Sequence, residues 1–140
     1  MDSHLRDEIV DILDRAVDMT IATLREDGYP QATTVSFVND GLTLYFGCGA
    51  HSQKAGNIRR DGRVSLTVNL PYANWNEIRG LCLGGVAALV TDPAEIDRAM
   101  ARMMAKFPQV RDFALTSDAQ MALVRVTPQV VSVLDYARGF

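Results

Sequence analysis

Four cationic side chains lie close together in the segment GAHSQKAGNIRRDGRV (residues 49–64), although the chain as a whole is acidic. They are Lys54, Arg59, Arg60 and Arg63. The acidic residue among them is Asp61, whereas the complete chain of 140 residues carries a formal net charge of −3. A positive segment in a negative protein indicates either a binding site for an anion or a helix with solvated charges.

A short helix that begins after Ser52 is predicted in this segment, because serine is a preferred N-cap residue. Arg59 and Arg60 then lie in the last turn, where the helix dipole stabilises cations by a few tenths to about 1 kcal/mol without any ligand. Lys54 lies in the first turn, where the dipole disfavours a cation unless an anion lies against it. Free N–H groups, a serine hydroxyl and an ammonium can together hold a phosphate. Gly56 is a poor helix former and indicates that another group packs closely there. By itself the pattern favours a solvated lysine over a phosphate ligand.

The rest of the chain is typical of short strands and amphipathic helices. Helices are expected at 3–17, from the capping Asp92 to Lys106, and at 109–115. Strands are expected at 19–25, 31–38, 42–47, 63–70, 78–90, 120–127 and 129–135. Asp-Gly turns join the first three strands, which predicts an antiparallel meander. Gly84 and Gly85 indicate a bulge within the long fifth strand, and Pro128 separates the last two strands.

These elements predict a single domain over residues 1–140, of the α+β class and mainly β. Its expected architecture is an antiparallel barrel of about six to seven strands, with about four helices packed outside. In the helix that ends at Lys106, four apolar side chains are expected to face the core. They are Ile96, Met100, Met103 and Met104.

Composition and spacing argue against several classes of function. A pI near 5.3 argues against general nucleic-acid binding, and the longest apolar run, 80–90, is too short to span a bilayer. No signal-peptide pattern is visible, so a cytoplasmic location is expected. Cys48 and Cys82 lack a CxxC spacing and are expected to be buried thiols. His4 and His51 have no acidic or cysteine cluster at ligand spacing, so no metal site is expected.

One motif and the order of the elements resemble a known family. The motif S-x-K-x-x-N-I-R-R-D-x-R-V-S-L begins at Ser52, and a loop with Trp75 and the pattern I-R-G-L-x-L-x-G from Ile78 follow it. From Met19 to the terminal LDYARGF, the chain resembles the pyridoxamine 5′-phosphate oxidase-like, flavin-binding split barrels. Such proteins are homodimers of a split antiparallel barrel that hold FMN in a cleft shared by two subunits.

The resemblance implies that the segment at the start of the short helix holds the FMN phosphate. The residues at those places are Ser52, Gln53 and Lys54, so the phosphate interpretation of Lys54 is now favoured over solvation. Cys48 precedes this segment at a place where the family usually has a threonine-like residue. His51 is interpreted either as a phosphate contact or as an exposed loop histidine.

Two further parts of the cofactor site are implied by the resemblance. A strand is expected along the isoalloxazine ring, and its residues are Ala32, Thr33, Thr34, Val35 and Ser36. Trp75, Arg79 and Gly80 are expected near the cofactor of the partner subunit, although Trp75 could also be a core anchor for its loop. The terminal motif with Tyr136 and Arg138 is shared by many relatives, so a bound, ordered tail is one expectation, and a frayed terminus is the alternative.

The resemblance implies an FMN-dependent oxidoreductase that moves a hydride or electrons between a reduced nicotinamide or small organic donor and an acceptor. The cofactor would carry the redox chemistry, which suits a chain without a nucleophile motif. Pyridoxamine phosphate is not the expected substrate, because the tail lacks the Arg-x-His pair that orients it and the chain is short for that enzyme. Two alternatives stay open: a flavin store or sensor without turnover, and the same barrel using deazaflavin F420 or haem.

Overall fold

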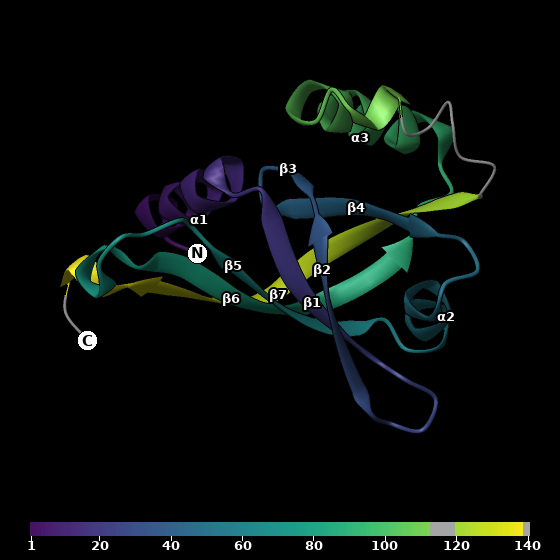
Figure 1. The fold of residues 1–140 in the computed structure, drawn as a ribbon, viewed down its shortest axis with the longest axis horizontal. Helices are drawn as coiled ribbons and strands as arrows, with labels where there is room; N and C mark the ends of the chain where they lie inside the picture. Colours follow the sequence, from purple (N-terminus) through teal and green to yellow (C-terminus); the bar gives the residue numbers. More distant parts are fainter. Residues whose placement is uncertain (113–119, 139–140) are drawn as a thin grey trace.

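Seven β-strands form one curled antiparallel sheet in the computed structural model, which describes residues 1–112 and 120–138 (Figure 1). The strands are β1 (Asp18–Leu24), β2 (Pro30–Ser36), β3 (Val38–Asp40), β4 (Thr43–Gly49), β5 (Arg63–Asn69), β6 (Arg79–Leu89) and β7 (Met121–Asp135). Their order across the sheet is β2-β1-β5-β6-β7-β4-β3. This arrangement confirms the predicted mainly β, α+β split barrel.

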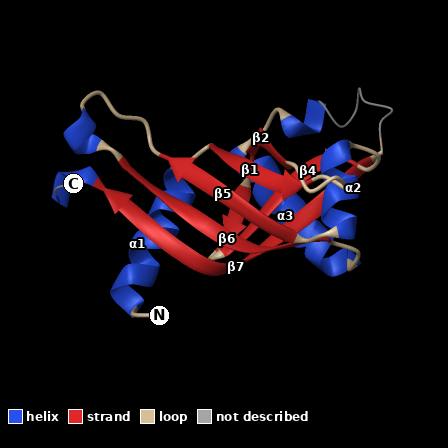
Figure 2. Cartoon of the chain, turned by 90° about the horizontal axis from the view of Figure 1, so that it is seen from below, coloured by secondary structure: helices blue, strands red, loops and turns tan. Residues whose placement is uncertain are grey.

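Helices cover the outside of the sheet and its ends (Figure 2). In the described residues they are α1 (Ser3–Arg15), α2 (Gln53–Arg60), α3 (Pro93–Lys106) and the 3-10 turns η1 (Trp75–Glu77) and η2 (Tyr136–Arg138). No helix in this part of the chain is both long and apolar enough to cross a membrane.

The chain passes from one edge of the sheet to the other between β2 and β3. β2 pairs with β1, whereas β3 pairs with β4 at the opposite edge. Phe37, which is fully buried, is the single residue between these strands, and Val38 after it is buried too. Two buried neighbours interrupt the in-and-out alternation of a strand, so the chain bends there. The predicted three-strand meander is therefore wrong at its second step. The turn after β3 leads into β4, which pairs with β3 and not with β2.

The main hydrophobic core fills the inside of the curled sheet. Along β5, Val64, Leu66 and Val68 are buried while their neighbours are exposed, as expected for a strand with one face toward a core. α1 closes one end of this core with fully buried side chains, each worth about 1.5–3 kcal/mol of burial. They are Ile9, Ile12 and Leu13.

α3 is fastened to the sheet by polar contacts as well as by a smaller apolar cluster. Asp92 caps the helix by accepting a hydrogen bond from the Glu95 N–H at 3.2 Å, and Pro93 occupies its first turn, as predicted. The hydroxyl of Tyr45 donates to the Glu95 carboxylate at 2.7 Å, and Arg125 pairs with the same carboxylate at 2.7 Å. α3 is thereby tied to β4 and to β7.

β7 is one continuous strand, although Pro128 predicted two. The register between β6 and β7 shifts at the predicted bulge, where Gly84 lies opposite Val130 and Gly85 opposite Pro128. β4 pairs with β7 only as far as Val126. Pro128 lies beyond that point, so β4 loses no hydrogen bond because the proline has no N–H group. A residue without an N–H group is accommodated at such a position.

Smaller predictions also differ from the structure. Cys48 is buried as predicted, but Cys82 is exposed, contrary to the prediction. Its neighbours in β6 are buried, so the alternation of the strand turns Cys82 to the outer face. On α3, Met104 is 44 % exposed, and Ala99 is buried on the inner face beside Met103. The helix expected at 109–115 extends over positions outside the described residues.

Candidate functional site

The predicted phosphate-binding segment is the start of α2, which follows β4 directly. Ser52 is the N-cap, as predicted, and its hydroxyl accepts a hydrogen bond from the Ala55 N–H at 3.2 Å. The same hydroxyl donates to the Gly49 carbonyl at 2.7 Å. A serine hydroxyl has one proton to donate. In this arrangement Ser52 shapes the turn into α2, and its proton is not directed at a ligand.

Two backbone amides and one ammonium are the donors at this end of α2. The first bond of the helix ladder runs from the Gly56 N–H to the Ser52 carbonyl at 3.1 Å. The N–H groups of Gln53 and Lys54 precede this bond, so helix geometry gives them no intrahelical acceptor. The Lys54 ammonium lies 5.8 Å from the centre of the Phe46 ring and forms no ion pair with a carboxylate of the described residues. Its charge is therefore open to an external anion.

The arginines of the cationic segment have other roles. Arg60 donates to the backbone carbonyl of Leu24, which ties the end of α2 to β1, so more than the helix dipole accounts for it. Arg63 forms an ion pair with Asp61 at 2.7 Å, and this guanidinium lowers the pKa of the Asp61 carboxyl to about 2. Arg59 is exposed in the last turn, where the dipole favours a cation.

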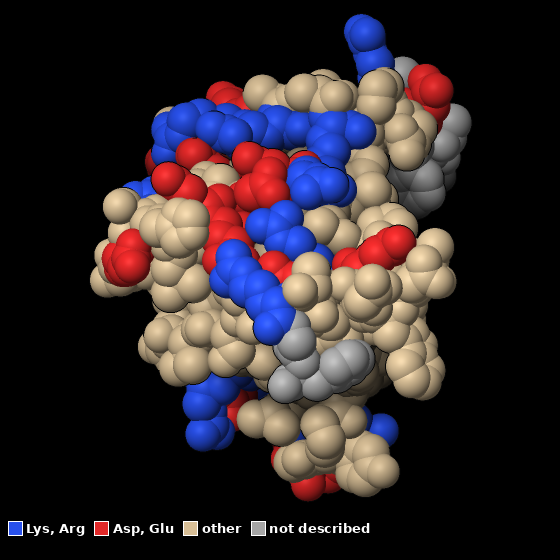
Figure 3. Space-filling view, turned by 90° about the vertical axis from the view of Figure 1, so that its left-hand side faces the viewer, with Lys and Arg blue, Asp and Glu red and all other residues tan. Residues whose placement is uncertain are grey.

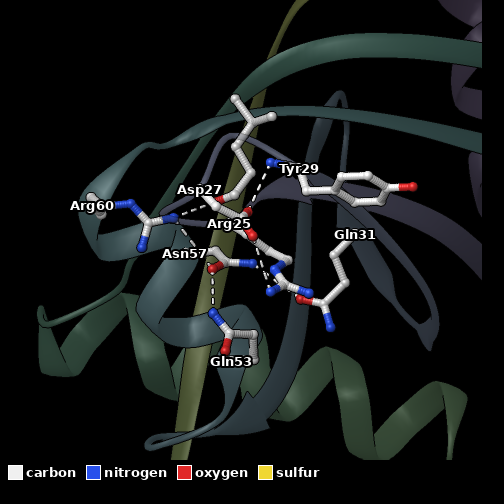
Figure 4. Close-up of polar contacts among 8 residues, drawn as sticks. Arg25, Asp27, Tyr29, Gln31, Gln53, Asn57 and Arg60 are labelled. Carbon is white, nitrogen blue, oxygen red and sulfur yellow. Dashed lines mark hydrogen bonds and ion pairs between the residues drawn. The ribbon is translucent and has the colours of Figure 1, made fainter.

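A buried amide that the sequence analysis did not single out fixes α2 against the β1–β2 hairpin (Figure 4). Asn57 has no exposed surface, and its Nδ2 donates to Thr23 Oγ1 at 3.0 Å and to Gln31 Oε1 at 3.1 Å. Its Oδ1 accepts from Gln53 Nε2 at 2.7 Å. The signal was present in the sequence, since Asn57 is the asparagine of the quoted motif and lies one turn after Gln53. Through these bonds Asn57 determines how the start of α2 faces the hairpin.

A hollow of about 380 Å³ lies between the hairpin and the start of α2. Its lining residues are Arg25, Glu26, Asp27 and Gln53. Arg25 pairs with Asp27 at 3.1 Å across the tip of the hairpin (Figure 4). The hollow is polar and adjoins the first turn of α2, so it offers room for a charged group next to the amides described above.

β2, the strand expected along a flavin ring, is an edge strand beside the same hairpin. Ala32, Thr34 and Ser36 are exposed, whereas Thr33 and Val35 are half-buried. The Oγ1 atom of Thr33 is buried without a hydrogen-bond partner among the described residues. An edge strand has unpaired backbone N–H and C=O groups along one side. β2 can therefore present both backbone donors and small side chains to a ligand.

Other predicted residues near α2 differ in their burial and in their contacts. His51 is exposed in the turn before Ser52. Cys48 packs within the main core, opposite Ala122 of β7. A methyl group added at Gly56 would meet no atom within 4 Å, so no close packing within this chain explains that glycine.

The start of β6, which carries Arg79 and Gly80, lies at the opposite end of the sheet from α2 (Figure 1), and Trp75 of η1 comes just before it in the chain. The Ala87 N–H binds the carbonyl of Gly62, just after α2, at 2.6 Å. Arg79 starts β6 eight residues before Ala87, which corresponds to about 25 Å along a strand. Within one chain, the structure does not bring these three residues to the start of α2.

At that end the three residues differ in their exposure and in their contacts within the chain. Trp75 is 74 % exposed, so the interpretation of it as a core anchor is wrong. Arg79 lies 2.8 Å from the Asp11 carboxylate of α1, and this hydrogen bond lowers the pKa of Asp11. Gly80 is buried against the backbone, because an added Cβ would overlap the carbonyl of Val68.

The C-terminal turn is held against the same end of the molecule. Arg138 pairs with Glu8 of α1 at 3.2 Å, and the Tyr136 N–H donates to the Ile78 carbonyl at 2.9 Å. Figure 3 shows basic and acidic side chains intermingled on this side of the molecule. As far as Arg138, the tail is ordered as the sequence analysis expected.

Comparison with known proteins identifies the family. The sequence profile of the pyridoxamine 5′-phosphate oxidase family matches residues 5–135. The chain belongs to this family. Among curated proteins, none matches the sequence closely enough to count as a relative.

Solved structures of similar fold belong to proteins of different function. A conserved hypothetical protein of Mycobacterium tuberculosis is 26 % identical with a TM-score of 0.80, over 93 % of this chain and 84 % of that one. The haem storage protein HutZ of Vibrio cholerae is 20 % identical with a TM-score of 0.75, over 91 % and 92 %. An F420 reductase is 25 % identical with a TM-score of 0.67, over 87 % and 94 %. The fold is therefore shared by a haem storage protein and an F420 reductase.

Proposed function

We propose that this family member is an FMN-dependent oxidoreductase that binds the FMN phosphate at the N-terminus of α2. The observation that supports the proposal is the Lys54 ammonium, which has no ion-pair partner among the described residues. Lys54 belongs to the first turn of α2, where the N–H groups of Gln53 and Lys54 have no intrahelical acceptor. A phosphate would accept hydrogen bonds from these donors and would also offset the unfavourable position of a cation in the first turn. The residues present therefore fit the phosphate end of the cofactor.

The edge strand β2 suits the ring of the same cofactor. Its outward side chains, Ala32, Thr34 and Ser36, are small, and its free edge has backbone donors. When bound, FMN would supply the redox chemistry, and the chain would supply position and electrostatics. The proposed reaction moves a hydride or electrons between a reduced nicotinamide or small organic donor and an acceptor. The substrate stays unassigned, and a cytoplasmic location stays a prediction from the sequence.

We propose further that two copies of the chain form the working protein. Trp75 and Arg79 lie about 25 Å along the sheet from the end near α2, so in a homodimer they would reach the cofactor bound at the partner's α2. Trp75 and Tyr72 are 74 % and 51 % exposed in a single chain, and exposed aromatic side chains in one loop are typical of a surface that another group covers.

Two alternatives are supported by the structural neighbours. The likeness to a haem storage protein and to an F420 reductase favours the same barrel with another cofactor, or a binding protein without turnover. The absorption spectrum and mass of the ligand that copurifies with the protein separate these cases. A flavin spectrum and the mass of FMN would favour the proposal, whereas a Soret band or the mass of F420 would replace it.

The proposal predicts that Lys54→Ala weakens FMN binding. Loss of a charge-assisted hydrogen bond costs about 1.5–3 kcal/mol, which is roughly one to two decades in dissociation constant. Fluorescence titration of the apoprotein with FMN measures the change. Riboflavin, which lacks the phosphate, should lose far less affinity in the same variant.

Arg59→Ala is the matched control, because Arg59 is a cation of the same helix at its opposite end. Its FMN affinity should stay close to that of the wild type. Equal FMN affinities for wild type and Lys54→Ala would contradict the proposed phosphate site, even if the protein binds FMN elsewhere.

A further inference from the structure

A second hollow, of about 360 Å³, lies between α1, β3 and α3, and none of its lining residues belongs to the proposed cofactor site. They are Asp14, Val38, Asn39, Arg102, Ala105 and Lys106. The hollow combines charged side chains from two helices with an amide from a strand, and it is independent of the proposed FMN function.

Lys106 is the unusual residue of this hollow. Its Nζ is buried and has no hydrogen-bond partner among the described residues. The amine lies 4.5 Å from the centre of the Phe37 ring and 5.5 Å from that of Phe107. Burial lowers the pKa of Lys106, because a charged ammonium is poorly solvated there. A larger share of this amine is therefore neutral near pH 7 than for an ordinary lysine.

The charged groups around Lys106 do not restore its solvation. Asp14 of α1 and Asp18 of β1 favour the ammonium electrostatically, but neither forms an ion pair with it. Arg102, one turn earlier on α3, is held by the Asp40 carboxylate of β3 at 3.1 Å. The lowered pKa of Lys106 therefore comes from burial of its amine and not from a neighbouring cation. The net result is an amine in an aromatic environment at the edge of a polar hollow.

We propose that Lys106 is a nucleophilic amine that forms imines with small aldehydes entering the hollow between α1, β3 and α3. A lysine desolvated in an apolar environment is an arrangement that activates an amine for attack on carbonyl groups. The side chain stands in the last turn of α3 and lines the hollow, and among the described residues its Nζ contacts two phenylalanine rings but has no hydrogen-bond partner.

The reaction balances without any oxidant or reductant. The nitrogen lone pair attacks the carbonyl carbon and a C–N bond forms. The carbonyl oxygen then leaves as water together with the two hydrogens of the neutral amine, and a C=N bond remains. Water reverses the reaction, so the adduct is detected by reducing it to a stable secondary amine.

The chain provides its own internal control, because Lys54 and Lys106 are its two lysines. The folded protein without FMN, which would otherwise cover Lys54, is incubated briefly with acetaldehyde and cyanoborohydride at pH 7, and ethylation of each lysine is read from peptide masses. Lys106 should be labelled several-fold faster than Lys54, although the Lys106 amine is the more buried of the two. The difference should shrink toward pH 10, where ordinary lysine amines also become neutral.

Two further measurements separate this result from a structural effect. In urea the two lysines should be labelled at similar rates, because the hollow is lost. Lys106→Arg should remove the fast label while its circular dichroism stays that of the wild type, and Lys54→Arg should leave the labelling of Lys106 unchanged. Labelling of Lys106 at or below the rate of Lys54 in the native protein, or a preference that persists in urea, would overturn the proposal.

Discussion

At the scale of single residues, one buried amide positions the helix that carries the proposed phosphate site. Asn57 uses both hydrogens of its Nδ2 on Thr23 and Gln31, and its oxygen accepts from Gln53. A buried polar group with all its partners stabilises one arrangement of neighbouring elements, because every alternative leaves a donor or acceptor unpaired. Asn57 therefore links the stability of the fold to the direction in which Lys54 faces.

Asn57→Ala should lower the free energy of unfolding by about 2–4 kcal/mol, since it removes several buried hydrogen bonds and leaves a small cavity. Urea unfolding followed by circular dichroism measures this loss. Arg59→Ala, an exposed change on the same helix, should lower the free energy by less than about 0.5 kcal/mol. Equal midpoints for the two variants would show that the Asn57 network is not stabilising.

The sequence predicted the local part of this site and missed its distant part. The Ser52 cap was predictable, because its bonds to Ala55 and Gly49 span three residues each. The bonds of Asn57 to Thr23 and Gln31 span 34 and 26 residues. Partners at such separations depend on strand pairing, which local pattern does not reveal.

At the scale of elements, the bulge between β6 and β7 shows how two neighbouring glycines differ. A Cβ added at Gly85 would lie 2.5 Å from the Thr127 carbonyl, whereas one added at Gly84 would meet nothing within 4 Å. The sequence predicted a bulge at this pair, but only the structure shows which glycine is required. Gly85 permits β7 to pass close to β6 opposite Pro128.

Gly85→Ala should therefore destabilise the protein by about 1–3 kcal/mol, the usual cost of overpacking, because the backbone of β7 must move. Gly84→Ala is the matched control and should change the unfolding midpoint little. Thermal unfolding of both variants at one protein concentration tests the contrast. The interpretation of the bulge fails if the two alanines have the same effect.

The sequence also predicted most element boundaries, because caps and turns are local signals. The capping Asp92 with Pro93 placed α3 correctly. The predicted meander failed at Phe37, since a buried aromatic residue looks the same in a straight strand and at a bend. Pro128 predicted a strand break, whereas the structure accommodates it within β7. The pairing of β4 with β7 ends before this proline, and local sequence does not reveal where that pairing ends.

At the scale of the whole molecule, the proposed cofactor site has two halves that one chain keeps apart. Lys54 belongs to α2, whereas Trp75 belongs to η1, just before the start of β6 at the opposite end of the sheet. Strand order and register decide this separation, and neither follows from local sequence pattern. The resemblance to a family provided the expectation of a shared site, which the geometry of one chain makes testable.

A mixing experiment tests whether the halves come from different copies. Lys54→Ala and Trp75→Ala should each weaken FMN binding alone. Unfolded together and refolded, they should regain about a quarter of the sites, because half of the symmetric pairs are mixed and each mixed pair has one intact site. FMN titration of the refolded mixture measures the recovery.

The matched control is a mixture of Lys54→Ala with Ser52→Ala. Ser52→Ala removes the cap that shapes the start of α2, so both changes damage the same half of the site. Every site in a mixed pair is then damaged, and no recovery is expected. If the first mixture also shows no recovery, Lys54 of one copy and Trp75 of the other do not form one FMN site, and the proposed shared site is contradicted.

The strand order also bears on how the chain folds during its synthesis. β4 is paired along its length with β7, so Leu44 meets Val126, a residue made much later. Until then the apolar side chains of β4, including the fully buried Phe46, have no strand beside them on that edge. Pairings between distant segments slow folding, and an uncovered edge invites association with other chains. The newly made N-terminal part of this protein should therefore depend on chaperones until its last strand leaves the ribosome.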